Sequence, residues 1–180
     1  SLTCLRMEYT HVDLSLVWNH CLVRLSLLKQ LNLTWKESYH PLTPLPSVQH
    51  FTASSRDIYS FFGTLDSLPN LETLQFESLY SESQDWGPFW EHVSPHTQLT
   101  HLCIADTDYT FLGQRGRLHC DPMAKALLVL SHLVALQVPT VRLASPLSLA
   151  ESIQNLTALT WLELKWKEGE EFVQVVEEIC

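Results

Sequence analysis

The 180-residue chain has few glycines, few cationic side chains and no long uninterrupted apolar stretch. Its five glycines exclude a collagen-type repeat, and they form neither a Gly-x-Ser-x-Gly nucleophile elbow nor a Gly-Lys-Ser/Thr phosphate loop. The net charge is −9, from 11 lysines and arginines against 20 aspartates and glutamates. This balance argues against a nucleic-acid partner, which requires clustered cations. The longest charge-free apolar stretch, residues 126–141, is shorter than the ~20 residues of a membrane span, so we expect no membrane partner.

Cysteine is also scarce, and its five residues include no Cys-x-x-Cys pair. An odd, low count does not suit a disulfide scaffold and favours reduced thiols in the cytoplasm or nucleus. Two glycosylation triplets begin at Asn32 and Asn155, but such triplets often arise by chance. The first residues contain neither an initiator methionine nor a basic and apolar leader. We therefore expect one domain over residues 1–180, truncated at both ends.

Leucine, in contrast, occupies 33 of the 180 positions and follows a recurring pattern. The unit has apolar residues at its first, fourth and sixth positions, and successive units begin at unequal intervals. The shortest interval runs from Leu28 to Val48, and the longest runs from Leu99 to Leu133. The seven units are Leu2/Leu5/Met7, Leu28/Leu31/Leu33, Val48/Phe51/Ala53, Leu71/Leu74/Phe76, Leu99/Leu102/Ile104, Leu133/Leu136/Val138 and Leu159/Leu162/Leu164.

Two of these units are close copies of each other. Residues 28–37 and 159–168 share the pattern Leu-x-x-Leu-x-Leu-x-Trp-Lys-Glu. The set Leu22, Leu25 and Leu27 also fits the template for the second unit. The match between the two copies favours the unit that begins at Leu28.

The pattern within each unit indicates a strand followed by a helix. Apolar residues two positions apart line one face of a strand, and helical spacing occurs between the units, as in residues 57–68. Asp121 before Pro122 predicts a helix N-cap, and Ser148 with Glu151 predicts a capping box. A last helix is predicted near residue 180, with an apolar stripe formed by Phe172, Val173, Val176 and Ile179. Because one such unit cannot bury its own leucines, stacked units should form a curved parallel sheet with helices outside.

These seven units resemble those of leucine-rich-repeat proteins, and the resemblance covers nearly the whole chain. It implies an α/β solenoid, or horseshoe, of about seven irregular repeats. The family's asparagine or cysteine at the ninth position is replaced throughout, which favours the intracellular, helix-bearing subclass. The irregular spacing and the tryptophans resemble the degenerate repeats of fungal F-box proteins. The residues at the ninth position are Thr10, Lys36, Arg56, Leu79, Thr107, Val141 and Lys167.

In that family the third, fifth and seventh positions of each unit line the concave face of the sheet, where a protein partner binds. Here this face is expected to be small and polar in its middle, and aromatic and charged toward its ends. Trp161 is the expected hot spot, because exposed tryptophans often carry binding energy. The candidate binding residues are Arg6, Glu8, Gln30, Asn32, His50, Gln75, Glu77, His101, Gln137, Trp161, Glu163 and Lys165.

Catalysis has little support in the sequence. His92, His96, His101 and Cys103 lie close together in the chain and contain zinc-ligating atoms. However, His101 and Cys103 are expected on the concave face, and His92 and His96 in the segment before that strand. We therefore expect no enzyme and no cofactor, and an enzyme with a His/Cys metal site remains the remote alternative.

The resemblance implies protein–protein recognition. Its most specific form is the substrate-binding region of an F-box ubiquitin-ligase subunit, with the ligase adaptor bound through an upstream F-box absent from these residues. The alternative is a repeat scaffold or sensor, such as the repeats of an immune receptor or of a ribonuclease-inhibitor-like binder. Repeats of this kind serve many roles, so the pattern indicates fold more strongly than function.

Overall fold

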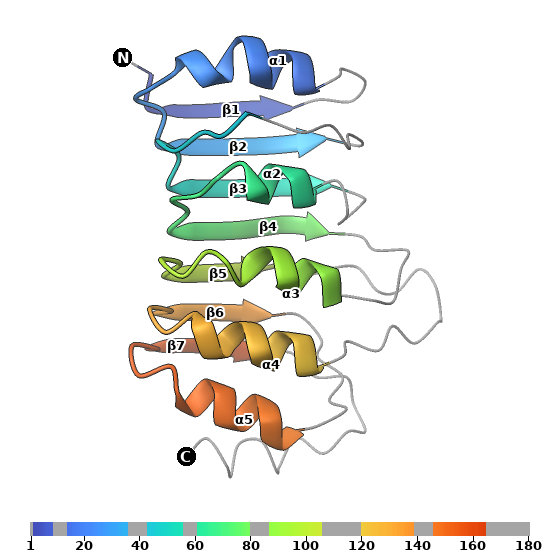
Figure 1. Ribbon diagram of the computed structural model, residues 1–180, viewed down its shortest axis with the longest axis vertical. Coiled ribbons are helices and arrows are strands. Elements are labelled where there is room, and N and C mark those ends of the chain that lie inside the picture. Colours follow the sequence, from blue (N-terminus) through green and yellow to red (C-terminus); the bar gives the residue numbers. More distant parts are fainter. Residues whose placement is uncertain are drawn as a thin grey trace, which may run out of the picture.

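The computed structural model describes residues 2–8, 14–35, 43–55, 61–79, 87–105, 120–138 and 146–164. In these residues the chain forms an α/β structure with a single open sheet of seven parallel strands. The strands follow one another in chain order, and the helices lie on one side of the sheet (Figure 1). The elements are β1 (Cys4–Glu8), α1 (Leu14–His20), the 3₁₀ helix η1 (Leu22–Arg24), β2 (Gln30–Trp35), β3 (His50–Ser55), α2 (Phe62–Asp66), β4 (Thr73–Leu79), α3 (Gly87–Val93), β5 (His101–Ile104), α4 (Cys120–Val129), β6 (Ala135–Val138), α5 (Pro146–Gln154) and β7 (Trp161–Leu164).

The seven sequence units lie side by side in register. The fourth position of each unit pairs with the fourth position of the next, from Leu5 with Leu31 to Leu136 with Leu162. In the five inner strands, the fourth and sixth positions are at most 2 % exposed and face the helices. The choice of the unit beginning at Leu28 is confirmed, because β2 contains the unit's later leucines while Leu22 belongs to η1.

A column of backbone carbonyls joins each strand to the next at its N-terminal end. The carbonyl oxygen of Thr3 accepts hydrogen bonds from the N–H groups of Lys29 and Gln30, at 2.8 and 3.0 Å. The same pair of bonds recurs between every later pair of neighbouring units, and the acceptor is always the residue just before a strand. This carbonyl column consists of Thr3, Lys29, Gln49, Glu72, Thr100 and Val134.

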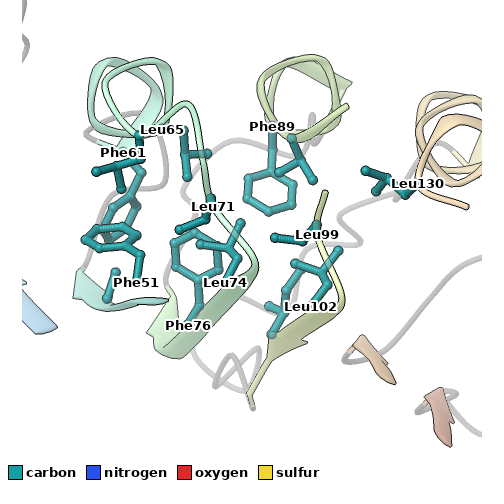
Figure 2. Close-up of a cluster of buried hydrophobic side chains, with 14 of the residues drawn as sticks. Phe51, Phe61, Leu65, Leu71, Leu74, Phe76, Phe89, Leu99, Leu102 and Leu130 are labelled. Carbon is teal, nitrogen blue, oxygen red and sulfur yellow. The ribbon is translucent and has the colours of Figure 1, made fainter. Parts of the chain in front are cut away.

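The core between sheet and helices contains a continuous aromatic cluster (Figure 2). Phe61, just before α2, contacts Phe76 of β4 edge to face, with ring centroids 5.0 Å apart. Phe76 in turn contacts Phe89 of α3 at 5.5 Å, and Phe51 of β3 contacts Phe61 at 6.5 Å. All four rings are fully buried. These edge-to-face contacts link neighbouring strands through the helices that cover them.

A second buried column precedes the strands and was not part of the predicted unit. Its members lie three positions before the first residue of each unit. In most units the carbonyl of this residue accepts a hydrogen bond from the N–H of the unit's first residue, which closes a tight turn. Leu45, Leu68, Leu130 and Leu156 occupy this column and are buried, whereas Leu25 is partly buried. His96 takes the same place before β5 and is also buried. The column therefore contains one imidazole among leucines.

The connection between β2 and β3 is held by side chains of α1. Trp18 is buried, and its indole Nε1–H donates to the carbonyl oxygen of Thr43 at 2.8 Å. Asn19 Oδ1 accepts hydrogen bonds from the backbone N–H and the hydroxyl of Thr43, each at 2.9 Å. The following Leu45 donates its N–H to the carbonyl of Ser67. These bonds attach residues 43–45 to α1 on one side and to Ser67, just after α2, on the other.

Two predicted helix starts are wrong. The helix α5 begins at Pro146, so Ser148 lies inside it and is not an N-cap. The Ser148 carbonyl instead accepts a hydrogen bond from the Ser152 hydroxyl. The helix α4 begins at Cys120, which places Asp121 in the first turn. Backbone N–H groups in the first turn of a helix have no acceptor within the helix, so proline, which lacks an N–H, is well suited to that turn. At Pro146 this preference sets the start of the helix more strongly than the Ser-x-x-Glu pattern that follows. The predicted last helix, with Phe172 and its partners, lies outside the described residues.

Candidate functional site

The face of the sheet that points away from the helices is lined by the third, fifth and seventh positions of the units, and we call it the open face. None of the described side chains at these positions is buried. The central row of this face, in paired register from β1 to β7, is Arg6, Asn32, Thr52, Gln75, Cys103, Gln137 and Glu163. The neighbouring row is Cys4, Gln30, His50, Thr73, His101, Ala135 and Trp161.

The middle of the open face is polar, and Glu77 of β4 is the one aspartate, glutamate, lysine or arginine among its described side chains in β2 to β6. Gln30 Nε2 donates to Asn32 Oδ1 at 3.5 Å within β2. His50 Nδ1 lies 3.0 Å from the hydroxyl oxygen of Thr73 on the neighbouring strand. The thiol of Cys103 donates to Oε1 of Gln137, from β5 to β6. Because these side chains bond to one another, they present a partly ordered set of hydrogen-bonding groups.

Charge and aromatic surface lie toward the ends of the sheet, as predicted. At the β1 end, Arg6 and Glu8 form an ion pair of 3.1 Å, with both side chains about two-thirds exposed. At the β7 end, Trp161 is 55 % exposed and Glu163 is partly buried. An exposed tryptophan on a sheet face suits the centre of a binding contact. Lys165, also predicted on this face, lies outside the described residues.

Glu77 is exposed, but its predicted alignment with the other seventh positions is wrong. The pairing between β3 and β4 shifts after Ala53, so Ser54 pairs with Ser78 and not with Glu77. This irregularity adds one residue to β4 and displaces its end relative to its neighbour. The strand pattern around Phe76 gives no sign of the extra residue. The other described candidates lie at the register positions expected from the sequence.

The histidines and the cysteine that are close together in the sequence do not all lie on the same side of the sheet. His101 and Cys103 belong to the open face of β5, whereas His92 lies on α3 among the helices. His92 Nδ1 is 2.8 Å from a carboxylate oxygen of Asp66, and its ring stacks on Phe62 at 4.5 Å. Within the described residues, no group of three or more histidines, cysteines or acidic residues could hold a metal ion.

His96 lies near Asp66 and His92, in the buried column that precedes the strands. Its burial lowers its pKa from the ordinary value of 6.5. The carboxylate of Asp66 opposes this shift, and the neighbouring His92 adds to it. The imidazole thus replaces a leucine in an environment that disfavours its charged form.

Two further observations concern the setting of the chain. No helix in the described part of the structure has the length and apolar character needed to cross a membrane. Cys4 and Cys21 are exposed free cysteines, and the thiol of Cys103 donates the hydrogen bond to Gln137 described above. Cys120 and Cys180 lie among the positions whose side chains are not described.

Comparison of the chain with protein-family models, curated proteins and solved structures finds no match. Function must therefore be inferred from the open face itself. Five members of the two rows lie outside the candidate set, namely Cys4, Thr52, Thr73, Cys103 and Ala135. Two of them matter most for the surface: Thr73 contacts His50, and Ala135 lies between His101 and Trp161 in register. The unit pattern places both at open-face positions, but their small size gave no reason to select them.

Proposed function

We propose that this chain is a protein–protein recognition module of the leucine-rich-repeat type, which binds its partner on the open face. One observation carries the proposal: among the described residues, two paired rows of polar and aromatic side chains run across all seven strands without a buried member. Helices cover the other side of the same sheet (Figure 1). A sheet that buries one face and exposes a continuous polar face to solvent offers a preformed binding surface.

The size of the open face suits an ordinary protein partner. Seven parallel strands at a spacing of about 4.8 Å span roughly 29 Å between the outer strands. A standard interface buries about 800 Å² on each partner, which this width can supply when residues at the strand ends also contribute. The backbone geometry requires no movement, because the side chains are already on the surface. The leucine-rich-repeat assignment is supported by the strand-and-helix units and by the irregular intervals between them.

The more specific proposal is that the chain forms the substrate-binding region of an F-box ubiquitin-ligase subunit. In that role the repeats perform no chemistry. They hold a target protein close to the transferring enzyme and so raise its effective concentration. The surface available for such a role is the row of open-face side chains that crosses all seven strands.

A cross-linking experiment in the intact parent protein tests the binding face. A photoreactive residue in place of Gln75 would lie at the middle of the open face, and the matched position Glu91 lies exposed on α3 among the helices. We expect Gln75 to cross-link a discrete partner in the native cells and Glu91 to leave it uncaptured. Equal capture from both positions, or capture from Glu91 alone, would assign the partner to another surface.

Single substitutions sharpen this test. Trp161→Ala should reduce partner capture at least tenfold, because an exposed tryptophan is a typical hot spot. Leu128→Ala is the matched control, since Leu128 is 53 % exposed on α4. Unchanged capture by the Trp161 variant would contradict its assigned role. A cullin and its adaptor among the captured proteins would support the ligase proposal, and their absence beside a stable partner would favour a scaffold.

A further inference from the structure

Three neighbouring strands place a small residue between two rings on the open face. His101 of β5 pairs with Ala135 of β6, and Ala135 pairs with Trp161 of β7. These three strands are neighbours in the sheet (Figure 1). His101 and Trp161 are exposed, and Ala135 is partly exposed. We call this arrangement the aromatic slot. Ala135 has the smallest side chain of the three, and the two ring-bearing residues belong to the strands on either side of it.

The dimensions of the aromatic slot suit a flat or slender side chain. Two strand spacings of about 4.8 Å separate the backbones of His101 and Trp161 by roughly 9.6 Å. A group centred over Ala135 would lie one strand spacing, about 4.8 Å, from the backbone of each flanking strand. In the same row, Thr73 separates His101 from His50, but its hydroxyl already contacts His50 at 3.0 Å. Alanine leaves more room and adds no polar group of its own, while His101 Nδ1 lies 2.9 Å from the hydroxyl oxygen of the preceding Thr100.

The charge around the slot favours a cation. Glu163 follows Trp161 by two residues on the same strand, which places it about 6.6 Å further along the open face. Among the described side chains of this face, Arg6 is the single lysine or arginine, and it is paired with Glu8. Among the described open-face side chains, the three carboxylates of Glu8, Glu77 and Glu163 outnumber the one cation of Arg6, in a chain of net charge −9. A phosphorylated or acidic segment would meet repulsion there.

We propose that the aromatic slot binds an arginine side chain from an extended segment of the partner protein, with Glu163 interacting with its charge. The guanidinium is planar, stacks on aromatic rings and bonds to carboxylates, so it fits both features of the site. This inference rests on the proposed function and names the chemistry of the partner. Gln137, which pairs with Glu163 in the register, supplies an amide beside the same end of the slot.

Peptide titration of the 180-residue chain tests the aromatic slot. The probes are a Gly/Ser peptide with one central arginine and the same peptide with citrulline, which keeps the shape and removes the charge. The readout is the indole N–H resonance of Trp161, assigned by Trp161→Phe. We expect a saturable shift with the arginine peptide, at least tenfold weaker binding of the citrulline peptide, and no shift with phosphoserine. Equal responses to arginine and citrulline, or a response to phosphoserine, would overturn the proposal.

A matched pair of variants separates the slot from the rest of the face. Ala135→Leu fills the slot and should abolish the arginine response, whereas Ala135→Gly should retain it. Since Ala135 is partly exposed outside the helix-covered core, both variants should keep the urea unfolding midpoint. Retained binding by a folded Ala135→Leu variant would overturn the slot. If Gln75 still cross-links the partner in that variant, the open-face function stands without the slot; if Gln75 never captures a partner, the function itself fails.

Discussion

Replacing Phe76 by leucine should destabilise the fold by removing two aromatic contacts while keeping an apolar side chain in the core. Phe76 is fully buried in β4, and its ring meets Phe61 and Phe89 at 5.0 and 5.5 Å with interplanar angles near 70° (Figure 2). Edge-to-face pairs contribute about 0.5–1.5 kcal/mol each beyond the area they bury. The two pairs together predict a loss of about 1–3 kcal/mol in the free energy of unfolding.

Urea unfolding followed by circular dichroism would measure this loss. Leucine is preferable to alanine, because Phe→Ala costs about 3–5 kcal/mol and a typical domain has only about 5–15 kcal/mol in total. A double-mutant cycle with Phe89→Leu should give a coupling energy of about 0.5–1.5 kcal/mol. Val138→Ala in β6, two strands away, is the control and should add independently. A coupling near zero for Phe76 with Phe89 would refute the reasoning.

Three further predictions concern stability. Burial lowers the pKa of His96, so the unfolded state takes up the proton first and the free energy of unfolding should fall as the pH drops below 6.5. His96→Leu should reduce that pH dependence, seen by comparing urea midpoints at about pH 7.5 and about pH 5.5. Trp18→Phe removes the hydrogen bond to the β2–β3 connection and should cost about 1–3 kcal/mol. Trp90→Phe should cost less in the same assay, because the buried indole N–H of Trp90 makes no hydrogen bond in the described structure. Arg6→Ala should change the unfolding free energy by less than about 0.5 kcal/mol, since its ion pair is largely exposed, and a larger change in the urea midpoint would contradict this.

The sequence predicts the strands well because their leucines repeat with a period of two. Leu31 and Leu33 project to one side and Asn32 to the other, so the buried and open faces follow directly from the pattern. Helix starts are predicted less well, because a serine with a later glutamate occurs both at caps and within helices. The helix containing Ser148 shows this, since the nearby Pro146 begins it.

The local features of the candidate site depend on contacts that no single unit contains. His101, Ala135 and Trp161 come from three separate units of the sequence, yet they lie side by side in the sheet. The face of each residue could be predicted, but the slot emerges only once the register is known. The irregularity beside Glu77 and the buried place of His96 were missed for the same reason.

The carbonyl column explains how units of unequal length can form a regular sheet. Its members are spaced unevenly along the chain, most closely at Lys29 and Gln49 and most widely at Thr100 and Val134, yet each accepts the same two N–H bonds from the next unit. Each strand therefore begins at the same level as its neighbour in the sheet. The number of residues between two strands does not change how later strands are aligned. The number of residues between a strand and the next helix can accordingly differ from unit to unit, while the rows of the open face stay aligned across the sheet.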